Sequence, residues 1–466
     1  MGVSMVGALE QIGYANERRP NVIIQIISFF LLTSFAIGIF TSWSQTLLNL
    51  TGFIALISVI YAALRLTACL APKPKPSESE PIESWPFYTV LVPLFREANM
   101  VPQLMSALSE LDYPKDKLEI FIICEAVDPP TIEEVRKRIG GVFHLIIVPP
   151  GAPQTKPRAL NYAMHRARGD YVTIYDAEDI PDPRQLKAAI RAFKADNHLG
   201  ALQAPLDYAN AHTNWLTRQF GLEYAALFHV WVPFLSSLGL PFPLGGTSNH
   251  MRRTALEAIQ GWDSHNVTED ADLSFRLAAQ NWRLGYITPP TQEEAVSTFN
   301  AWHFQRARWM KGYLQTWQCH MRAPFAPGGL KGIARFFTLQ LTLGLTLISA
   351  LFHLPVMTGV AIYALYQYLS GASINIPAPF IASLAISYSA GMLIGGIGAM
   401  RARKPALLLS VPFMPLYWFA LCAPTVRALW ELRRNPFHWH KTEHGITPQR
   451  PLKTSPESLT SLHEYL

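Results

Sequence analysis

Long runs without any charged residue stand near both ends of the chain. No Asp, Glu, Lys or Arg occurs at residues 22–43, 46–64, 336–400 or 405–426. Because a helix needs about 20 apolar residues to cross a bilayer, these runs predict transmembrane helices. Buried helices of soluble proteins rarely lack charge over such lengths, so that alternative is the weaker one. The pattern therefore predicts a multi-pass membrane protein.

Between these runs, residues 85–325 show the pattern of a soluble domain. Short apolar runs predict four buried strands, at residues 88–92, 118–124, 142–148 and 171–175. Helical stretches lie between them, such as residues 100–110 and 158–168. Strands that alternate with helices imply a mostly parallel, Rossmann-like α/β sheet. Ligands of such sheets bind at the carboxyl ends of the strands, so residues that follow a strand are the first candidates for a site.

Basic residues indicate how the chain is oriented. Arg18 and Arg19 precede the first apolar run, and Arg65, Lys73 and Lys75 follow the second. The positive-inside rule then places the N-terminus and everything after residue 72 in the cytoplasm. We predict a transmembrane hairpin of two spans at residues 1–72, a linker at 73–84, the soluble domain at 85–325, interfacial and transmembrane helices at 326–432, and a cytoplasmic tail at 433–466.

The C-terminal apolar block leaves two topologies open. Basic residues indicate a cytoplasmic loop at residues 401–404 and a cytoplasmic tail from residue 433. These two marks conflict if residues 405–426 cross the membrane once. Either that segment is a re-entrant hairpin, or residues 336–369 cross twice and the loop breaks the rule.

Composition excludes several classes of protein. Only 15% of the residues are charged, below the usual quarter of soluble proteins, and 50% are hydrophobic. The four cysteines are far apart and show no metal-binding spacing, so they predict no disulfide framework. The net charge of +6 mostly reflects Lys and Arg beside the apolar runs. It indicates contact with anionic lipid, and no nucleic-acid partner.

Acidic residues follow the fourth predicted strand directly, in Asp176-Ala-Glu-Asp179. In extended chain, positions i and i+2 face the same side, so Asp176 and Glu178 can converge. Carboxylates suit Mg²⁺ or Mn²⁺, which bridge diphosphate oxygens. Asp179 either assists them or caps the turn at Pro181. A solvated acidic turn is an equal alternative for this motif taken alone.

Two further pairs of charged residues lie near predicted strand ends. Glu125 and Asp128 follow the second strand, where they could accept hydrogen bonds from a nucleobase or ribose, or cap the following helix. Lys156 and Arg158 stand at a predicted helix N-terminus. There they could form an anion site, with a surface charge pair as the alternative.

Thr268-Glu-Asp270 precedes a predicted helix at residues 271–280. Acids in the first turn after a threonine cap are an ordinary helix start. Asp270 could instead act as a general base that takes a proton from an attacking hydroxyl. Both interpretations remain open from this triplet alone.

Gln305-Arg-Ala-Arg-Trp309 predicts a helix face that carries chemistry. At helical spacings of three and four, Gln305, Arg308 and Trp309 share one face. Arg308 could bind a diphosphate, and Trp309 could stack on a sugar. An amphipathic helix at the membrane interface is the alternative, and one helix can be both.

The ordered set of motifs resembles family 2 glycosyltransferases, in the membrane-embedded, processive branch that includes bacterial cellulose synthase and hyaluronan synthase. The TED and QxxRW signatures of that branch are intact at Thr268–Asp270 and Gln305–Trp309. Its DxD corresponds to Asp176 and Glu178, with Glu in place of the second Asp. The resemblance covers residues 85–317. It implies a GT-A fold, a nucleotide-sugar donor, Mg²⁺ or Mn²⁺ as cofactor, and inversion at the anomeric carbon.

The resemblance also implies a role for individual residues. Gly246 and Thr247 belong to a segment similar to the one that lines the acceptor end of the family's cleft. The implied set comprises the catalytic residues Glu269, Asp270 (the base) and Arg308; donor contacts from Glu125, Asp128, Lys156, Arg158 and Asp176; acceptor contacts from Gly246, Thr247, Gln305 and Trp309; and metal contacts from Asp176, Glu178 and Asp179.

These matches imply an enzyme of the bacterial inner membrane with a cytoplasmic catalytic domain. We expect it to add sugar, with UDP-glucose as donor, to a growing β-linked exopolysaccharide, with the lipid bilayer and export proteins as partners. One alternative is transfer of a single sugar to a lipid-phosphate carrier. Alternatives outside enzymes are an inactive scaffold, which should have lost Asp176 or Asp270, and a transporter, which should carry charges inside its spans.

Overall fold

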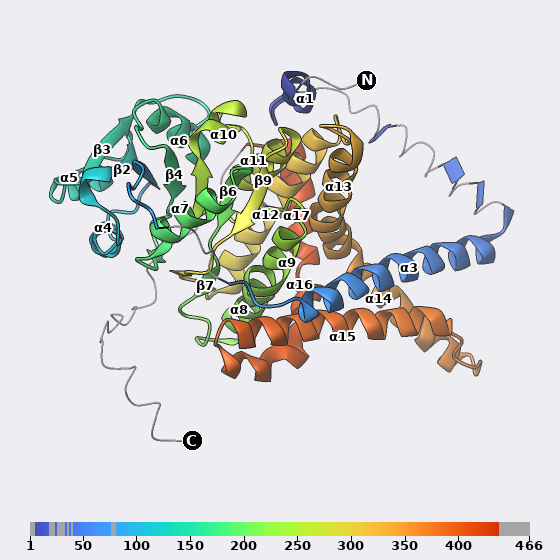
Figure 1. Cartoon of the computed structure of the whole chain (residues 1–466). Helices are drawn as coiled ribbons and strands as arrows, with labels where there is room; N and C mark the ends of the chain where they lie inside the picture. The colour runs from blue at the N-terminus through green and yellow to red at the C-terminus, as the bar shows by residue number, and fades with distance from the viewer. Residues whose placement is uncertain are drawn as a thin grey trace.

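The molecule has a sheet-containing soluble domain and a set of long helices that project from it (Figure 1). The computed structural model describes residues 5–17, 24–25, 33–34, 37–38, 41–75 and 81–437. The first predicted span, at residues 22–43, and the predicted tail, at 433–466, lie largely outside the described residues. The second predicted span, the soluble domain and the C-terminal apolar block are described.

A seven-stranded sheet forms the centre of the soluble domain, in the order β3-β2-β1-β4-β8-β6-β9. All neighbours in it pair in parallel except β8, which is antiparallel to both β4 and β6. A second sheet has the order β5-β10-β7. The strands are β1 (Tyr88–Leu94), β2 (Leu118–Glu125), β3 (Phe143–Val148), β4 (Tyr171–Ile174), β5 (Ile180–Pro181), β6 (Leu199–Gln203), β7 (Leu206–Tyr208), β8 (Asn249–Arg252), β9 (Arg283–Tyr286) and β10 (Thr291–Glu293).

The period of two along the central strands supplies both faces of the sheet with apolar side chains. Phe121 and Ile123 of β2 pack into one core, together with helix α6. Ile120 and Ile122 pack into the other, together with helices α4 and α7. Strands buried on both faces read as continuous apolar runs, which is why β1 and β2 were predictable from sequence.

The helices of the soluble domain alternate with its strands. The last of them is one long helix, α12. They are α4 (Val101–Ser109), the short 3-10 helix η1 (Lys115–Lys117), α5 (Pro129–Arg136), α6 (Lys156–Met164), α7 (Gln185–Ala195), α8 (Trp215–Ala226), the π-helical turn η2 (Leu227–Trp231), α9 (Val232–Ser237), α10 (Arg253–Ala258), α11 (Glu269–Ala279) and α12 (Phe299–His320). Two of them begin earlier than predicted, since α6 starts at Lys156 and α11 at Glu269. Both starts bring charged residues into a first helical turn.

Four helical segments of the described chain are long and apolar enough to cross a membrane. The helices outside the soluble domain are α1 (Met5–Ile12), α3 (Trp43–Leu70), α13 (Gly329–Leu339), η3 (Gln340–Gly344), α14 (Leu345–Leu369), α15 (Ala378–Arg401), η4 (Pro405–Phe413), α16 (Met414–Ala420) and α17 (Cys422–Arg434). Helices α3 and α15 lie side by side (Figure 1). Arg65, which the charge pattern placed after the second span, lies inside α3, because that helix continues to Leu70.

The helices of the C-terminal block favour the re-entrant alternative. Residues 336–369 form part of one helical run, so they do not fold back to cross twice. The segment from Pro405 to Arg434 is broken into η4, α16 and α17, and both of its ends contact the soluble domain. Lys404 Nζ donates to the Tyr208 carbonyl (2.8 Å), and Gln315 Nε2 donates to the Pro436 carbonyl (3.0 Å). Both ends of the segment therefore lie at the soluble domain, which is the arrangement that the re-entrant alternative requires.

Candidate active site

A cavity of ≈ 740 Å³ lies where the carboxyl ends of the central strands meet the long helices. The soluble domain contributes the residues after β2 and β4, the start of α11 and one face of α12. The helices outside the soluble domain contribute residues of α3, α15 and α16. Its size suits a small-molecule substrate, and its walls belong to both parts of the molecule.

Asp176 lies at the cavity wall, two residues after the end of β4 at Ile174. Its backbone N–H donates to Asp179 Oδ2 at 2.7 Å. The Thr247 hydroxyl donates to the same carboxylate, so Asp179 and Thr247 together fix the turn that carries Asp176. Thr247 and Glu178 line the cavity, whereas Asp179 is not among the lining residues.

Lys156 connects Asp176 to the segment that carries Gly246. Its Nζ lies 2.5 Å from Asp176 Oδ1 and 2.8 Å from the Gly246 carbonyl oxygen. Burial alone would lower the Lys156 pKa, but the carboxylates of Asp176 and Glu269 raise it above its ordinary value. The side chain is therefore a fixed positive charge at the centre of the site.

Asp270 sits in the first turn of α11 with both carboxylate oxygens held by backbone N–H groups. Ala271 N–H donates to Oδ1 at 2.8 Å, and Gly246 N–H donates to Oδ2. Gly246 has a φ of +39°, a conformation that glycine adopts most readily. Burial raises the pKa of Asp270, while the two backbone bonds oppose that rise. A raised proton affinity suits a general base.

The cavity wall has more acidic than basic side chains. Burial and the neighbouring Asp176 raise the pKa of Glu178 to about 8. Burial and Asp270 raise the pKa of Glu269 to about 7. Glu293 of β10 also lines the cavity, and burial followed by Asp179 raises its pKa well above the ordinary value. Such an acidic wall is a place where a cation would be stabilised.

The carboxylate oxygens at this wall fit a hard divalent cation only if a bound substrate supplies further metal ligands. Carboxylate oxygens are of the type that Mg²⁺ and Mn²⁺ prefer. Within the described residues, however, no three acidic, histidine or cysteine side chains converge closely enough to hold a metal ion. Mg²⁺ commonly takes one or two carboxylates and completes its shell with substrate phosphates and water. Asp176 and Glu178 are the residues that would hold such an ion here.

Helix α12 presents the predicted face to the cavity, where Gln305, Arg308 and Trp309 all line the wall. Its contact with α11 is close because Gly312 has no side chain. A β-carbon at Gly312 would collide with the Thr268 side chain. This approach brings the start of α11, with its acidic triplet, against the helix that carries Arg308. The two best-matched motifs of the sequence therefore form one wall.

Trp309 is held by neighbours that the sequence did not single out. Its ring stacks on Tyr224 of α8, with centroids 6.3 Å apart, and the Arg306 guanidinium lies 4.6 Å from its centroid. Arg306 forms a fork on the Glu223 carboxylate, which also accepts from the Tyr417 hydroxyl (2.7 Å). Trp309 is thus pre-oriented at the cavity wall before any acceptor binds.

The remaining predicted donor residues lie in two different settings. Glu125 lines the cavity at the end of β2, with Arg158 Nη1 3.6 Å from its Oε2. Asp128 and Arg158 are not among the lining residues. Asp128 Oδ2 accepts from the Arg96 N–H at 2.5 Å and so holds the loop that contributes Arg96 to the wall.

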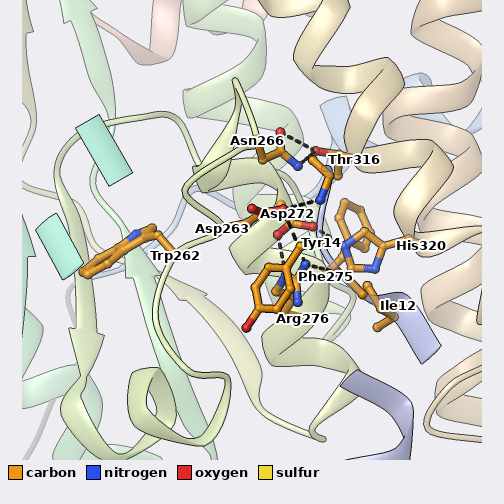
Figure 2. Close-up of polar contacts among 12 residues, drawn as sticks. Ile12, Tyr14, Trp262, Asp263, Asn266, Asp272, Phe275, Arg276, Thr316 and His320 are labelled. Carbon is orange, nitrogen blue, oxygen red and sulfur yellow. Dashed lines mark hydrogen bonds and ion pairs between the residues drawn. The ribbon is translucent and has the colours of Figure 1, made fainter. Parts of the chain in front are cut away.

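Behind α11, a buried polar network fixes the rotation of that helix (Figure 2). Asp272 lies two residues after Asp270 and pairs with Arg276 and with His320 of α12. Arg276 Nη2 also donates to the Gly13 carbonyl (2.5 Å), which ties the N-terminal segment to the network. The position of the candidate base therefore depends on contacts from three parts of the chain.

Several cavity residues had no recognisable signal in the sequence. Arg306 lies within the Gln305–Trp309 motif, but the helix face was predicted from Gln305, Arg308 and Trp309. Glu223 and Tyr224 lie in a mostly apolar stretch without a motif, and Glu293 lies in a segment rich in Pro and Glu. Only the acidic pair at Glu293 and Glu294, which follows the β-branched Thr291 by two residues, could have suggested a short strand that ends at a site.

Fold and site together define a membrane glycosyltransferase with a GT-A domain. Residues 171–427 match the sequence profile of Glycosyl transferase family group 2, which is more than half of the chain. The chain belongs to that family. The family assignment and the GT-A fold inferred from the motifs are confirmed.

Two relatives and one solved structure illustrate the similarity. The β-monoglucosyldiacylglycerol synthase of Synechocystis sp. is 27% identical over 426 residues, covering 85% of this chain and 85% of that protein. The cellulose synthase catalytic subunit of Komagataeibacter sucrofermentans is 25% identical over 343 residues, covering 69% and 44%. A mannosyltransferase of Pyrobaculum calidifontis, in complex with GDP-Man and Mn²⁺, aligns with a TM-score of 0.52 at 21% identity, covering 82% and 99%.

Proposed function

We propose that the protein transfers a sugar, with inversion, from a nucleotide sugar to an acceptor hydroxyl that enters the cavity from the membrane. The observation that carries this proposal is the single cavity that joins Asp270 to α3, α15 and α16. A soluble acceptor would not need a binding wall built from membrane helices. A lipid would, because its acyl chains stay in the bilayer while its headgroup reaches the soluble domain.

In the reaction, Asp270 takes the proton of the acceptor hydroxyl, whose oxygen attacks the anomeric carbon. Lys156 and Arg308 lie among the acidic side chains of the cavity wall, and they stabilise the charge that develops on the departing diphosphate. A divalent cation held by Asp176 and Glu178 would neutralise part of the same charge when bound. Trp309 offers an apolar surface to the sugar C–H groups, oriented by Tyr224 and Arg306.

The depth of the cavity favours a lipid acceptor over a polymer. Its described lining extends along α3 as far as Tyr61 and along α15 as far as Gly391. At about 1.5 Å per residue, both positions lie roughly 15 Å from the helix ends that meet the soluble domain. This is about half of the ~30 Å hydrocarbon core. The relative that covers 85% of this chain, a β-monoglucosyldiacylglycerol synthase, supports the same acceptor class.

Growth of a β-linked exopolysaccharide is the second candidate. It is favoured by the intact Gln305–Trp309 motif and by the similarity to a cellulose synthase catalytic subunit. Under this candidate, Trp309 would hold the end of a glycan, and export proteins would be partners. For both candidates we propose UDP-glucose as donor, Mg²⁺ or Mn²⁺ as cofactor, and a bacterial inner membrane with the catalytic domain in the cytoplasm.

The experiment supplies purified protein in mixed micelles with labelled nucleotide sugars and three acceptors: diacylglycerol, a polyprenyl phosphate and a β-glucan oligosaccharide. Products are identified by mass spectrometry, and their anomeric configuration by NMR. We expect one β-linked sugar on a lipid, at a rate that matches nucleotide release. A water-soluble β-linked polymer would replace the lipid proposal with the second candidate, and an α-linked product would overturn both.

A further inference from the structure

Arg65 is the one charged residue of the candidate span Thr51–Leu70, and its side chain lines the active-site cavity. Its guanidinium lies 4.1 Å from the ring centroid of Tyr61, one helical turn earlier. Within the part of the chain that the structure describes, no carboxylate forms a salt bridge with Arg65. Charges inside membrane helices are costly, and they usually mark a place where a ligand or ion binds.

The surroundings of Arg65 form a small chamber at the membrane end of the cavity. Gly391 of α15 makes room for it, since a β-carbon there would lie 3.2 Å from Arg65 Nη1 and 2.7 Å from Trp418 Cη2. Trp231 packs edge-on to Tyr61, with centroids 5.9 Å apart. Tyr61, Trp231, Gly391 and Trp418 all line the same cavity as Asp270. The chamber therefore combines one guanidinium with aromatic walls.

A long basic side chain near a helix end can also extend to the membrane surface to keep its charge in water. The position of Arg65 argues against that function. Its guanidinium lies against Tyr61 of its own helix and beside Gly391 of the neighbouring helix, which directs it into the cavity. Arg434 shows the contrasting case, because it also stacks over an aromatic ring one turn earlier (Trp430, 4.8 Å) but is exposed and does not line the cavity.

We propose that this chamber binds the phosphate group of an anionic lipid, with Arg65 as the phosphate ligand and the aromatic side chains along the upper acyl chains. A guanidinium forms forked, charge-assisted hydrogen bonds to phosphate. The inference rests on the proposed entry of the acceptor from the membrane. The bound lipid is either the acceptor itself or a neighbour that holds a neutral acceptor in place.

The test measures lipid binding directly, by native mass spectrometry of the detergent-purified full chain titrated with phosphatidylglycerol. Diacylglycerol is the comparison without phosphate, and inorganic phosphate is added as competitor. The variants are Arg65→Gln and Gly391→Ala, whose added methyl would collide with the Trp418 ring and crowd the Arg65 guanidinium, so that the chamber narrows. Arg434→Gln is the matched control, and size-exclusion chromatography checks that each variant is folded.

We expect one tightly bound phosphatidylglycerol in wild type and in Arg434→Gln. Affinity should fall at least about tenfold in Arg65→Gln, as loss of one charge-assisted bond predicts, and fall also in Gly391→Ala. Equal affinity in wild type and Arg65→Gln would overturn the inference, as would displacement of the lipid by inorganic phosphate alone. Glycosylated phosphatidylglycerol after addition of donor identifies the lipid as acceptor. If Arg65-dependent binding persists while no lipid is glycosylated, the proposed function fails and the lipid site stands.

Discussion

Asp270 combines two properties that a general base needs, because it is fixed in position and its proton affinity is raised. Two backbone N–H groups orient its carboxylate, one from its own helix and one from Gly246. Burial in the acidic wall raises its pKa. The neighbouring Glu269 lines the same wall, so the two acids must be distinguished by experiment.

Asp270→Asn removes the proton acceptor and keeps the shape of the side chain. Loss of a general base costs about 10² to 10⁴ in rate, so we expect transfer to fall by that factor. Donor affinity, measured by calorimetry, should stay near the wild-type value because the proposed donor contacts are those of Asp176 and Lys156. Near wild-type turnover in this variant would show that another group takes the proton.

Trp309→Ala removes the aromatic surface beside the acceptor and leaves the donor end intact. We expect KM for the acceptor to rise roughly tenfold, in line with the loss of a stacking contact, with little change in donor affinity. Trp317→Ala is the matched control, since Trp317 lies on the same helix but outside the cavity, bonded to Gln340. A similar rise of KM in both variants would mean that the effect is structural.

Asp176 and Glu178 lead to a prediction about metal removal. Chelation with EDTA should abolish transfer, and Mg²⁺ or Mn²⁺ should restore it, because the acidic wall has too little positive charge to hold a diphosphate alone. Asp176→Asn should weaken donor binding and shift the metal concentration for half-maximal rate upward. Undiminished transfer in excess chelator would remove the metal from the proposal.

At the scale of elements, α11 is positioned by the network of Figure 2. Arg335 can only donate, and its Nη2 lies 2.5 Å from His320 Nδ1, so His320 must be neutral and donate through Nε2 to Asp272 (2.9 Å). Burial is the main cause that lowers the His320 pKa, from 6.5 to about 4. A protonated His320 would place two donors against each other and loosen the contact between α11 and α12.

This arrangement predicts a pH dependence of stability. Between pH 6.5 and 4 the unfolded chain binds a proton at His320 that the folded chain does not, so stability falls as the pH falls through this window. The loss is up to about 3 kcal/mol. Thermal unfolding in detergent between pH 4 and 7 measures it, and His320→Gln should flatten the slope. An unchanged slope in that variant would place the titration elsewhere.

Elements and site residues differ in how far the sequence predicts them. The four predicted strands and the helix of Gln305–Trp309 are confirmed, because continuous apolar runs and a 3.6-residue period are local signals. The antiparallel β8 was not predicted, since its pairing with β4 and β6 depends on contacts far apart in sequence. For the same reason, Glu223 and Glu293 were missed. The side chains of Asp128, Arg158 and Asp179 do not line the cavity, and the roles assigned to them stay predictions.

At the scale of the whole molecule, the contacts of the apolar helices lead to a prediction about which segments share a side of the membrane. The turn after α14 lies at the end of that helix away from the soluble domain, whereas both ends of the Pro405–Arg434 segment contact the domain. All four native cysteines are buried, so an introduced cysteine can be labelled without background.

Two cysteine variants test this arrangement with a membrane-impermeant maleimide. Ser373→Cys, in the exposed turn between α14 and α15, should react in intact cells from outside the cytoplasm. Arg434→Cys, exposed at the end of α17, should react only after the membrane is opened. Reaction of both from the same side would contradict the re-entrant course of the last segment.

The shared cavity also has a consequence for the biochemist who purifies this protein. Because part of the acceptor wall comes from α3, α15 and α16, the isolated soluble domain would present an incomplete pocket. A detergent monomer is amphipathic like the proposed acceptor, with a polar head and an alkyl tail, so it would compete for the same cavity. Measured rates should then depend on the detergent chosen and its mole fraction, and an enzyme that looks inactive in one micelle could work in a nanodisc.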